Sequence, residues 1–415
     1  MITICATASL CAAAFALLAD RQPETPDGPA PGTATKPPAK LIYHESTLRH
    51  RRQGILANAD RLGDLPFDGI TVNMPASWFA MSTDRWTYDE SYDNWIAPIE
   101  GLLNDPANGL TDNYLVLQTD RPADFLEDWS IAIANIRDLA AIARDAGFVG
   151  IYFDNEEYQT PIWDWPSTAD NPAAGFTAYA EAAREKGRLI GEAMSSEFPE
   201  IRVIVLHGPY IVDDNVPNSI RRNQFGVGSF ELFGPFYAGI LEGLGDRATM
   251  IDGGEVYALR TEQEFRDHAL WRRWGMSSNH HDVAFLDADD RRRHRERTEI
   301  SFGVYPLEFP IGSTMSPAVL RTTLEAALRQ SDSVTWFYSE EGMSPWEPTQ
   351  FTAEWMDALV AARAAAVEPS PLLRFGVDDV HTVHQQPFDA DRNGTIDARD
   401  REAVEGEARL FERDG

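Results

Sequence analysis

The chain has 415 residues, of which 43% are hydrophobic, and its formal net charge is −30 at pH 7. So acidic a chain is not expected to bind nucleic acid or an anionic membrane surface, because both require clustered Lys and Arg. The length suits one α/β barrel with attached segments, and the apolar fraction is large enough for a sizeable core.

The N-terminal segment, residues 1–19, is apolar and predicts a signal peptide or an N-terminal anchor, although no Lys or Arg precedes the apolar stretch. Ala14-Phe15-Ala16 offers a small-x-small cleavage site. Cys5 and Cys11 are the only cysteines, so the rest of the chain has no disulfide and no thiolate nucleophile. Residues 20–40 form a Pro- and Thr-rich linker. We therefore expect a secreted, periplasmic or cell-surface protein.

Residues 41–366 alternate between short apolar runs and segments of helical period, which predicts a parallel sheet covered by helices. The expected strands are 40–46, 69–75, 113–120, 150–157, 202–209, 248–257, 300–309 and 333–341. The clearest helices are 130–147, 176–198, 317–332 and 352–366. Eight such units predict an α/β fold of the (β/α)8 TIM-barrel type. A doubly wound open sheet is the alternative, but no GxGxxG follows the first strand.

Polar and acidic residues gather where the expected strands end, which is where a barrel places its active site. They are His44, Glu45, Asn73, Gln118, Asp154, Asn155, Glu156, Glu157, His207, Asp252, Glu255, Tyr305, Glu308, Tyr338, Glu340 and Glu341. Strand ends are usually wet, so any one of these residues can be incidental. The set contains no Lys or Arg, however, and carboxylates that share one cavity shift each other's pKa values. Glycosidic cleavage needs such a pair, one carboxyl protonated and one ionised.

Tryptophans accompany these strand ends, and their flat apolar faces suit sugar rings. Trp163 and Trp165 follow the fourth strand, and Trp336 lies on the eighth. Trp78, Trp86 and Trp95 lie in or near the long loop after the second strand.

The stretch YFDNEE at 152–157 resembles the fourth strand of (β/α)8 glycoside hydrolases. The Asn155-Glu156 pair resembles that of the large clan of retaining β-glycosidases. That resemblance implies Glu156 as acid/base and Glu308, at the end of strand seven, as nucleophile. The Asp154-x-Glu156 spacing is also similar to chitinase-like families, although Val149 and Tyr152 stand where that pattern has acidic residues.

Further alternatives remain for the partner of Glu156. Some α-glycosidases use an Asp at the end of strand four and another at the end of strand six, and Asp154 with Asp252 would match them. Asp252 is also the second choice as the partner of Glu156, because two glycines follow it. The expected substrate-binding residues are His44, Glu45, Asn73, Asn155, Glu157, Trp163, Trp165, His207, Glu255, Tyr305, Trp336 and Glu340.

Beyond a connector at 367–387, the segment 388–415 contains DADRNGTIDARD, which has the spacing of an EF-hand calcium loop. It predicts a structural Ca²⁺ held by Asp389, Asp391, Asn393, Thr395, Asp397 and Asp400. The Asp at the last position resembles a dockerin-type loop. Dockerins carry two such repeats, and a single repeat argues against a cohesin-type partner.

The sequence as a whole predicts a secreted glycoside hydrolase that acts on a neutral oligo- or polysaccharide, with retention of configuration and no cofactor for catalysis. We expect a monomer. The alternatives are a non-catalytic carbohydrate-binding barrel and a carboxylate-bridged metallohydrolase. His280 and His281 are weak metal-ligand candidates, because they precede a run, 287–299, that reads as an exposed, charged excursion.

Overall fold

The computed structural model describes residues 39–45, 50–119, 122–156, 162–166, 169–212, 230–270, 272–273, 287–307, 313–340 and 343–367. The predicted signal or anchor segment and the calcium loop lie outside these residues, as do all but the ends of the predicted linker and connector. Glu157 and Glu308 also lie outside them. Among the described residues, no helix combines the length and apolarity needed to cross a bilayer.

Every expected strand forms, in the expected order. The strands are β1 (Lys40–Glu45), β2 (Gly69–Val72), β3 (Tyr114–Gln118), β4 (Gly150–Asp154), β5 (Arg202–Val205), β6 (Thr249–Asp252), β7 (Thr298–Ile300), β8 (Gly303–Val304) and β9 (Val334–Ser339). The sheet order is β7-β6-β5-β4-β3-β2-β1-β9-β8, and each of these neighbouring pairs is parallel.

The two ends of this sheet order are β7 and β8, which follow each other within one short chain segment. That segment takes the place of the seventh strand of the barrel and closes the sheet. On one side, Ser301 N donates to Asp252 O at 2.8 Å, beyond the β6–β7 pairing. On the other side, Trp336 N donates to Phe302 O at 3.1 Å, next to the β8–β9 pairing. The segment therefore joins the two ends of the sheet order, and the prediction of a (β/α)8 barrel is confirmed.

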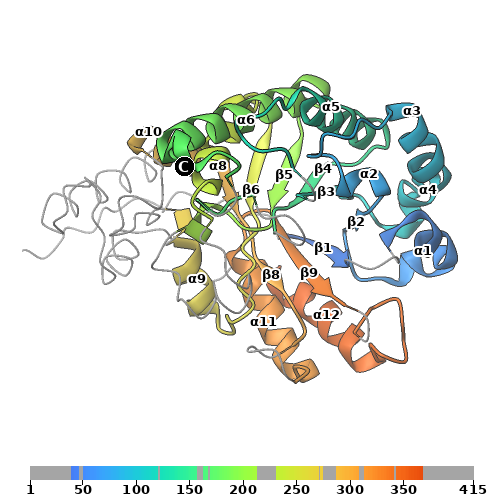
Figure 1. Ribbon diagram of the computed structural model, residues 1–415. Coiled ribbons are helices and arrows are strands. Elements are labelled where there is room, and N and C mark those ends of the chain that lie inside the picture. Colours follow the sequence, from blue (N-terminus) through green and yellow to red (C-terminus); the bar gives the residue numbers. More distant parts are fainter. Residues whose placement is uncertain are drawn as a thin grey trace, which may run out of the picture. The chain divides into compact units, whose positions relative to one another are not determined.

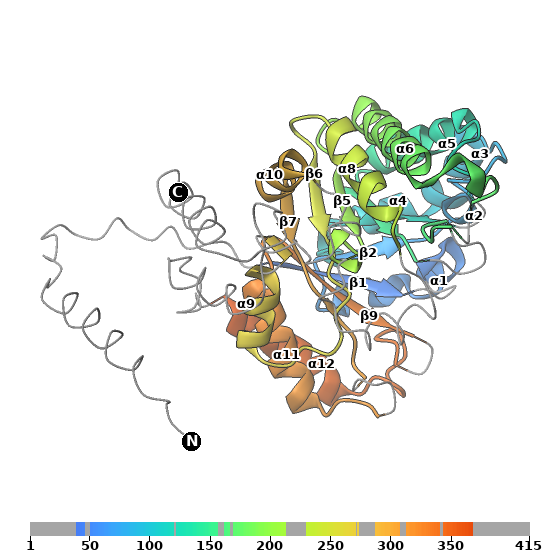
Figure 2. The same cartoon turned by 60° about the vertical axis from the view of Figure 1, so that its left-hand side comes forward.

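Helices follow the strands and cover the outside of the sheet (Figure 1). They are α1 (Arg52–Ala57), α2 (Pro75–Trp78), α3 (Tyr88–Ser91), α4 (Ala97–Leu103), α5 (Ser130–Asp145), α6 (Phe176–Glu197), α8 (Phe233–Gly243), α9 (Glu262–Leu270), α10 (Ala288–Arg297), α11 (Pro317–Gln330) and α12 (Ala353–Ala366). Both views place α5, α6 and α8 on one side of the strands and α9, α11 and α12 on another (Figures 1 and 2). The interpretation of 287–299 as an exposed excursion is wrong: most of it is α10, whose Asp290 and His294 are buried.

Successive side chains along each strand point to opposite faces of the sheet, so they pack into two separate cores. The barrel interior holds a small cluster that includes Ile42, Val116, Tyr152, Ile204, Ile251 and Trp336. Their neighbours in sequence face outward into the larger cluster between strands and helices. Side chains that extend the interior rows past the strand ends therefore meet at the mouth of the barrel, which is where the site is expected.

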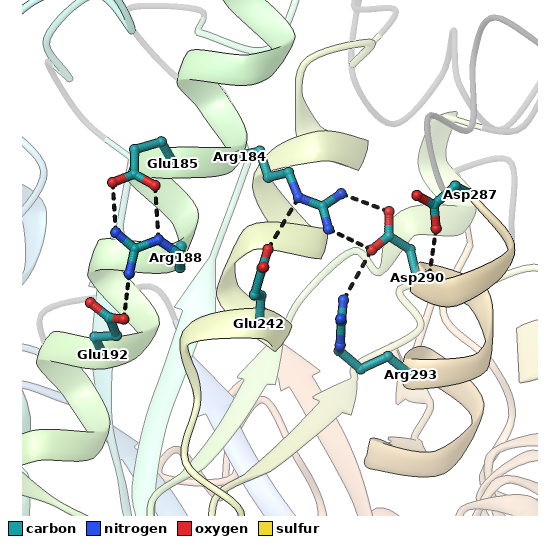
Figure 3. A network of polar contacts seen from close by, with 8 residues as sticks. All are labelled: Arg184, Glu185, Arg188, Glu192, Glu242, Asp287, Asp290 and Arg293. Atoms are coloured by element: carbon teal, nitrogen blue, oxygen red, sulfur yellow. Dashed lines mark hydrogen bonds and ion pairs between the residues drawn. The ribbon is translucent and has the colours of Figure 1, made fainter.

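Two arginines of α6 show how the outer helices are joined (Figure 3). Arg184 forms two 2.8 Å bonds to the buried Asp290 of α10 and one of 3.1 Å to Glu242 of α8. Arg188, one turn later, pairs with Glu185 and Glu192 on its own helix and with no other acidic side chain of the described residues, and both glutamates are exposed. The first arginine therefore compensates a buried charge, whereas the second forms surface pairs.

Arg184→Met is expected to lower the free energy of unfolding by roughly 3 kcal/mol, because it leaves the Asp290 carboxylate buried with fewer donors. The matched variant Arg188→Met should cost less than about 1 kcal/mol, since it removes only exposed pairs. Urea unfolding of both variants measures the difference. Equal losses would contradict the view that Asp290 joins the helices.

Candidate active site

The carboxyl ends of β4, β5 and β6 bring three ionisable side chains together. Glu156 follows β4, His207 follows β5 and Glu255 follows β6. His207 Nε2 lies 2.7 Å from an oxygen of Glu255 and 3.6 Å from an oxygen of Glu156. One oxygen of each glutamate and the imidazole nitrogen all lie within 4.8 Å of one another. The His207 side chain is fully buried, whereas that of Glu156 is 20% exposed.

His207 carries a positive charge at neutral pH. Burial by itself lowers the pKa of this imidazole, but the carboxylates of Glu255 and Glu156 outweigh burial and raise the pKa to about 9. Its Nδ1 lies 3.2 Å from the hydroxyl of Tyr210, which orients the ring. The cluster thus contains one imidazolium that lies between two acidic side chains.

Asn155 fixes the distance between the ends of β4 and β5. Its side-chain amide donates to His207 O at 3.0 Å, and its carbonyl accepts from His207 N at 2.9 Å. Both groups are buried, so the pair of bonds holds the backbone next to Glu156 against the backbone of His207. Asn155 was predicted to bind substrate, and in the structure its side chain forms this backbone clamp.

Asp154 is buried and lies beside Gln118 of β3. Its carboxylate accepts from Gln118 Nε2 at 2.9 Å and from Glu156 N at 3.2 Å. The second bond orients the chain at Glu156 itself. Asp154 therefore lies next to the cluster and can position both Glu156 and a bound ligand.

An aromatic layer lies in the barrel interior beneath the ionisable groups. The ring of His44 stacks on Tyr152 at 4.3 Å and on Tyr338 at 5.5 Å, and Trp336 meets Tyr152 edge-on at 5.7 Å. Trp336 is anchored by its Nε1, which donates to Gly253 O at 2.8 Å. Burial, together with the neighbouring Glu255 and Tyr152, raises the pKa of Tyr257, whose hydroxyl bonds to Glu255.

Three buried polar atoms of adjacent strands have no hydrogen-bond partner within the described residues. They are Asn73 Oδ1, Gln118 Oε1 and the Tyr152 hydroxyl. Burial and the carboxylates of Asp154, Glu255 and Glu156 raise the pKa of Tyr152, so its hydroxyl stays protonated beside them. Because unpaired buried polar groups are costly, these atoms are candidates to bind a polar ligand.

Asp252 lies behind the cluster and is tied to Arg272. The two form a fully buried ion pair of 2.7 Å. Burial raises the pKa of Asp252, and Arg272 opposes that shift. A Cβ on Gly208 would lie 2.2 Å from the Asp252 carboxyl carbon, and one on Gly254 would lie 2.3 Å from Arg272 Nη1. The pair thus packs directly against the residues that adjoin His207 and Glu255, and it positions both of them.

Among the remaining predicted residues that the structure describes, Glu45, Tyr305 and Glu340 are not part of this cluster. Glu45 is buried on the outward face of β1 and accepts from Tyr43 and Ser344. The exposed Glu340 accepts from Tyr338, and its bond to Tyr305 helps to raise that residue's pKa, after burial.

The two tryptophans after β4 lie in the outer core rather than on a free wall. Trp163 is fully buried against Phe233 and Phe236 and donates to Asn155 O at 2.9 Å. Trp165 is partly buried against Phe176 and Tyr179. Trp163 therefore has no open indole face for sugar stacking, whereas Trp165 is partly exposed.

Sequence reasoning missed Tyr152 and Arg272. Tyr152 precedes Asp154 by two positions on a strand, so the period of the strand places it on the same face and was the available signal. Arg272 lies far beyond β6 in the sequence, and no local pattern links it to Asp252. The strand-end residues identified from the sequence include no Lys or Arg, but the structure places Arg272 against Asp252 at the end of β6.

The cluster also has the composition of a divalent metal site. Glu156, His207 and Glu255 can each supply one ligand atom, and carboxylate with imidazole is a donor set that binds zinc and related ions. Tyr210, next to Nδ1, would orient the histidine as such sites require.

Comparison with known proteins adds structural likeness only. No protein-family model and no curated protein matches the chain. A GH18 chitinase from Pseudoalteromonas aurantia has 9% identity over 78% of this chain and 100% of its own, with a TM-score of 0.42. A β-mannanase from the blue mussel Mytilus edulis has 11% identity over 80% and 92%, also with 0.42. A 3-keto-D-glucoside 4-epimerase from E. coli has 10% identity over 79% and 99%, and again 0.42. At these TM-scores the likenesses carry no argument about chemistry, and the strand pairing alone establishes the barrel.

The charge of His207 predicts a pH-dependent stability. Because its folded pKa of about 9 exceeds the ordinary value of 6.5, the pairing contributes fully below pH 6.5 and is lost as the pH rises through 9. The free energy of unfolding should fall by about 3 kcal/mol between pH 6.5 and 10 in the wild type, relative to His207→Gln. Urea unfolding across this range measures it. Parallel profiles for the two proteins would show that His207 is not charged in the folded state.

Proposed function

We propose that this protein is a glycoside hydrolase that cleaves a neutral oligo- or polysaccharide with retention of configuration, using Glu156 as acid/base and Glu255 as the opposing carboxylate. The supporting observation is the approach of their oxygens to within 4.8 Å at the mouth of the barrel. Retaining enzymes hold their two carboxyl groups about 5–5.5 Å apart, whereas inverting enzymes leave a wider gap for water.

The two glutamates differ in ways that suit two roles. Glu255 lies 2.7 Å from the charged His207 and is the less exposed, which favours the ionised carboxylate that attacks. Glu156 lies farther from His207, at 3.6 Å, and is more exposed, which suits a group that exchanges a proton with substrate and water. The proposal thus assigns the partner role to Glu255 in place of Glu308 or Asp252, because Asp252 is committed to Arg272.

The reaction would proceed in two displacements. A Glu255 oxygen attacks the anomeric carbon while the bond to the leaving-group oxygen breaks, and Glu156 gives its proton to that oxygen. Glu156 then takes a proton from water, whose oxygen attacks the same carbon and releases Glu255. Asp154 and Tyr152 would hydrogen-bond the sugar, and the surrounding carboxylates would disfavour an anionic substrate.

The sequence supports two further parts of this proposal. The apolar N-terminal segment supports export, to the periplasm, the cell surface or the medium. The spacing of the acidic loop at 388–415 supports a structural Ca²⁺, which has no part in the reaction.

Glu156→Gln and Glu255→Ala should each lower kcat on a cleaved neutral glycan by at least about 10³-fold, because each removes an essential carboxyl group. Turnover is measured on mixed-linkage β-glucan, galactomannan, arabinoxylan and chitin oligosaccharides. Azide should restore activity to Glu255→Ala and yield a glycosyl azide, since it replaces the missing nucleophile.

The variants Glu308→Ala and Asp154→Asn separate this proposal from its rivals. A rescue of Glu308→Ala by azide, and none of Glu255→Ala, would make Glu308 the nucleophile. A third outcome would favour attack by the substrate's acetamido group. In it, the wild type cleaves only an N-acetylated substrate, Asp154→Asn loses this activity, and azide rescues neither Glu255→Ala nor Glu308→Ala. Full activity of Glu156→Gln would contradict the assignment of Glu156 as acid/base. Binding of a glycan by the wild type without any release of product would favour the non-catalytic barrel.

A carboxylate-bridged metallohydrolase is the second candidate, because the same three side chains form a possible metal site. If the glycosidase proposal holds, prolonged dialysis against EDTA should leave the catalytic rate within about twofold of its starting value. Elemental analysis before and after dialysis, with activity measured at each stage, tests this. The metallohydrolase would be favoured if the protein contains stoichiometric zinc, loses activity when the zinc is removed, and regains activity when zinc is added back.

A further inference from the structure

A hollow lies in the connection between β2 and β3, apart from the carboxylate cluster. It has a volume of about 350 Å³, and its walls include Phe79, Asp84, Arg85, Trp86, Glu90 and Trp95. That volume falls within the range of small-ligand pockets, roughly 300–1,000 Å³. None of these residues belongs to the carboxylate cluster described above.

The wall of this hollow is held in place by α5. Asn135, which is fully buried, donates to Asp84 O at 2.9 Å and accepts from Arg85 Nη1 at 3.0 Å. Arg85 also pairs with Asp138 of the same helix. The segment from Asp84 to Trp86 is therefore fixed by side-chain bonds to α5, and the hollow is preformed.

The two indoles present chemistry that suits a sugar. Arg52 lies over one face of Trp95 at 5.4 Å and is not part of the wall, so other parts of that ring line the hollow. Trp86 also has an arginine near its ring, Arg85 at 6.0 Å. Its Nε1 is buried and has no acceptor within the described part of the chain. Aromatic faces of this kind match the C–H faces of a pyranose.

The charges of the wall narrow the class of ligand. Asp84 and Glu90 are exposed and have no side-chain ion pair or hydrogen bond within the described residues, so they can accept from hydroxyl groups. The charge of Arg85 is already balanced by Asp138. The two uncompensated carboxylates would repel an anionic ligand, whereas they would accept hydrogen bonds from the hydroxyl groups of a neutral one.

We infer that this hollow is an accessory binding site for one or two units of a neutral saccharide. The inference rests on the proposed function for its choice of ligand. The site adjoins α2, which begins at Pro75, directly after the carboxyl end of β2. It therefore lies toward the same end of the barrel as Glu156, and one long glycan could engage both sites.

Affinity electrophoresis of the full chain tests the inference. Glu156→Gln serves as the non-cleaving background, and mixed-linkage β-glucan, galactomannan and arabinoxylan, each cast in a native gel, serve as probes. At least one polysaccharide should retard this protein, and adding Trp86→Ala or Trp95→Ala should weaken retardation about tenfold or more. The control Trp355→Ala, a partly buried tryptophan of α12, should change nothing. Trp86→Phe keeps a ring and should lose less than Trp86→Ala.

The outcomes for this site and for the proposed function are distinguishable. With Glu156 intact, Trp86→Ala should raise KM for the polysaccharide and leave kcat on a short oligosaccharide unchanged. Retardation that depends on Trp86 supports the site even if Glu156→Gln abolishes no activity. Cleavage with no effect of either tryptophan overturns the site and leaves the glycosidase standing. Retardation by none of the probes, or saturable binding of tetramethylammonium in place of a glycan, also overturns it.

Discussion

The buried ion pair between Asp252 and Arg272 is the interaction on which both the barrel and its site depend. Arg272 donates to the Asp252 carboxylate and also to Ser301 O, at the break between β7 and β8. The same guanidinium lies over Phe302 at 4.4 Å. One side chain thus fastens the end of β6 to the split strand that closes the barrel. Such a pair contributes little net stability, but removing one partner leaves the other charge buried and unpaired in the core.

The same pair determines where the ionisable side chains of the site can lie. Gly208 and Gly254 let it approach the backbone, and these glycines adjoin His207 and Glu255. Asn155 then joins His207 to the end of β4. The separation of Glu156 and Glu255 is therefore set by backbone contacts, not by the two flexible side chains alone. A cation between them lowers their mutual repulsion and allows both to lie near one point.

The barrel was predictable because its signals are local and repeated. Each strand is an apolar run rich in β-branched and aromatic residues, and each is followed by a turn or a helical period. The gathering of Asp154, Glu156, His207 and Glu255 followed from parallel strands, whose carboxyl ends share one face. The exact partners did not follow. Trp163 reads as a loop residue in sequence, yet Phe233 and Phe236 of α8 bury it. Similarly, α10 is so rich in charge that its buried Asp290 and His294 could not be distinguished from a solvated surface.

The sequence by itself determined the order of the strands, the barrel type and the end of the barrel at which acidic groups collect. These properties depend on the periodicity of apolar and polar residues over short stretches, which can be identified directly in the sequence. Only the tertiary structure decided which carboxylate lies opposite Glu156 and which carboxylate Arg272 pairs with. It also decided that Trp86 and Trp95 line the same hollow. Those outcomes depend on distances between residues far apart in the chain. Such distances are set by the closure of the ring and the packing of helices, and no local pattern encodes them.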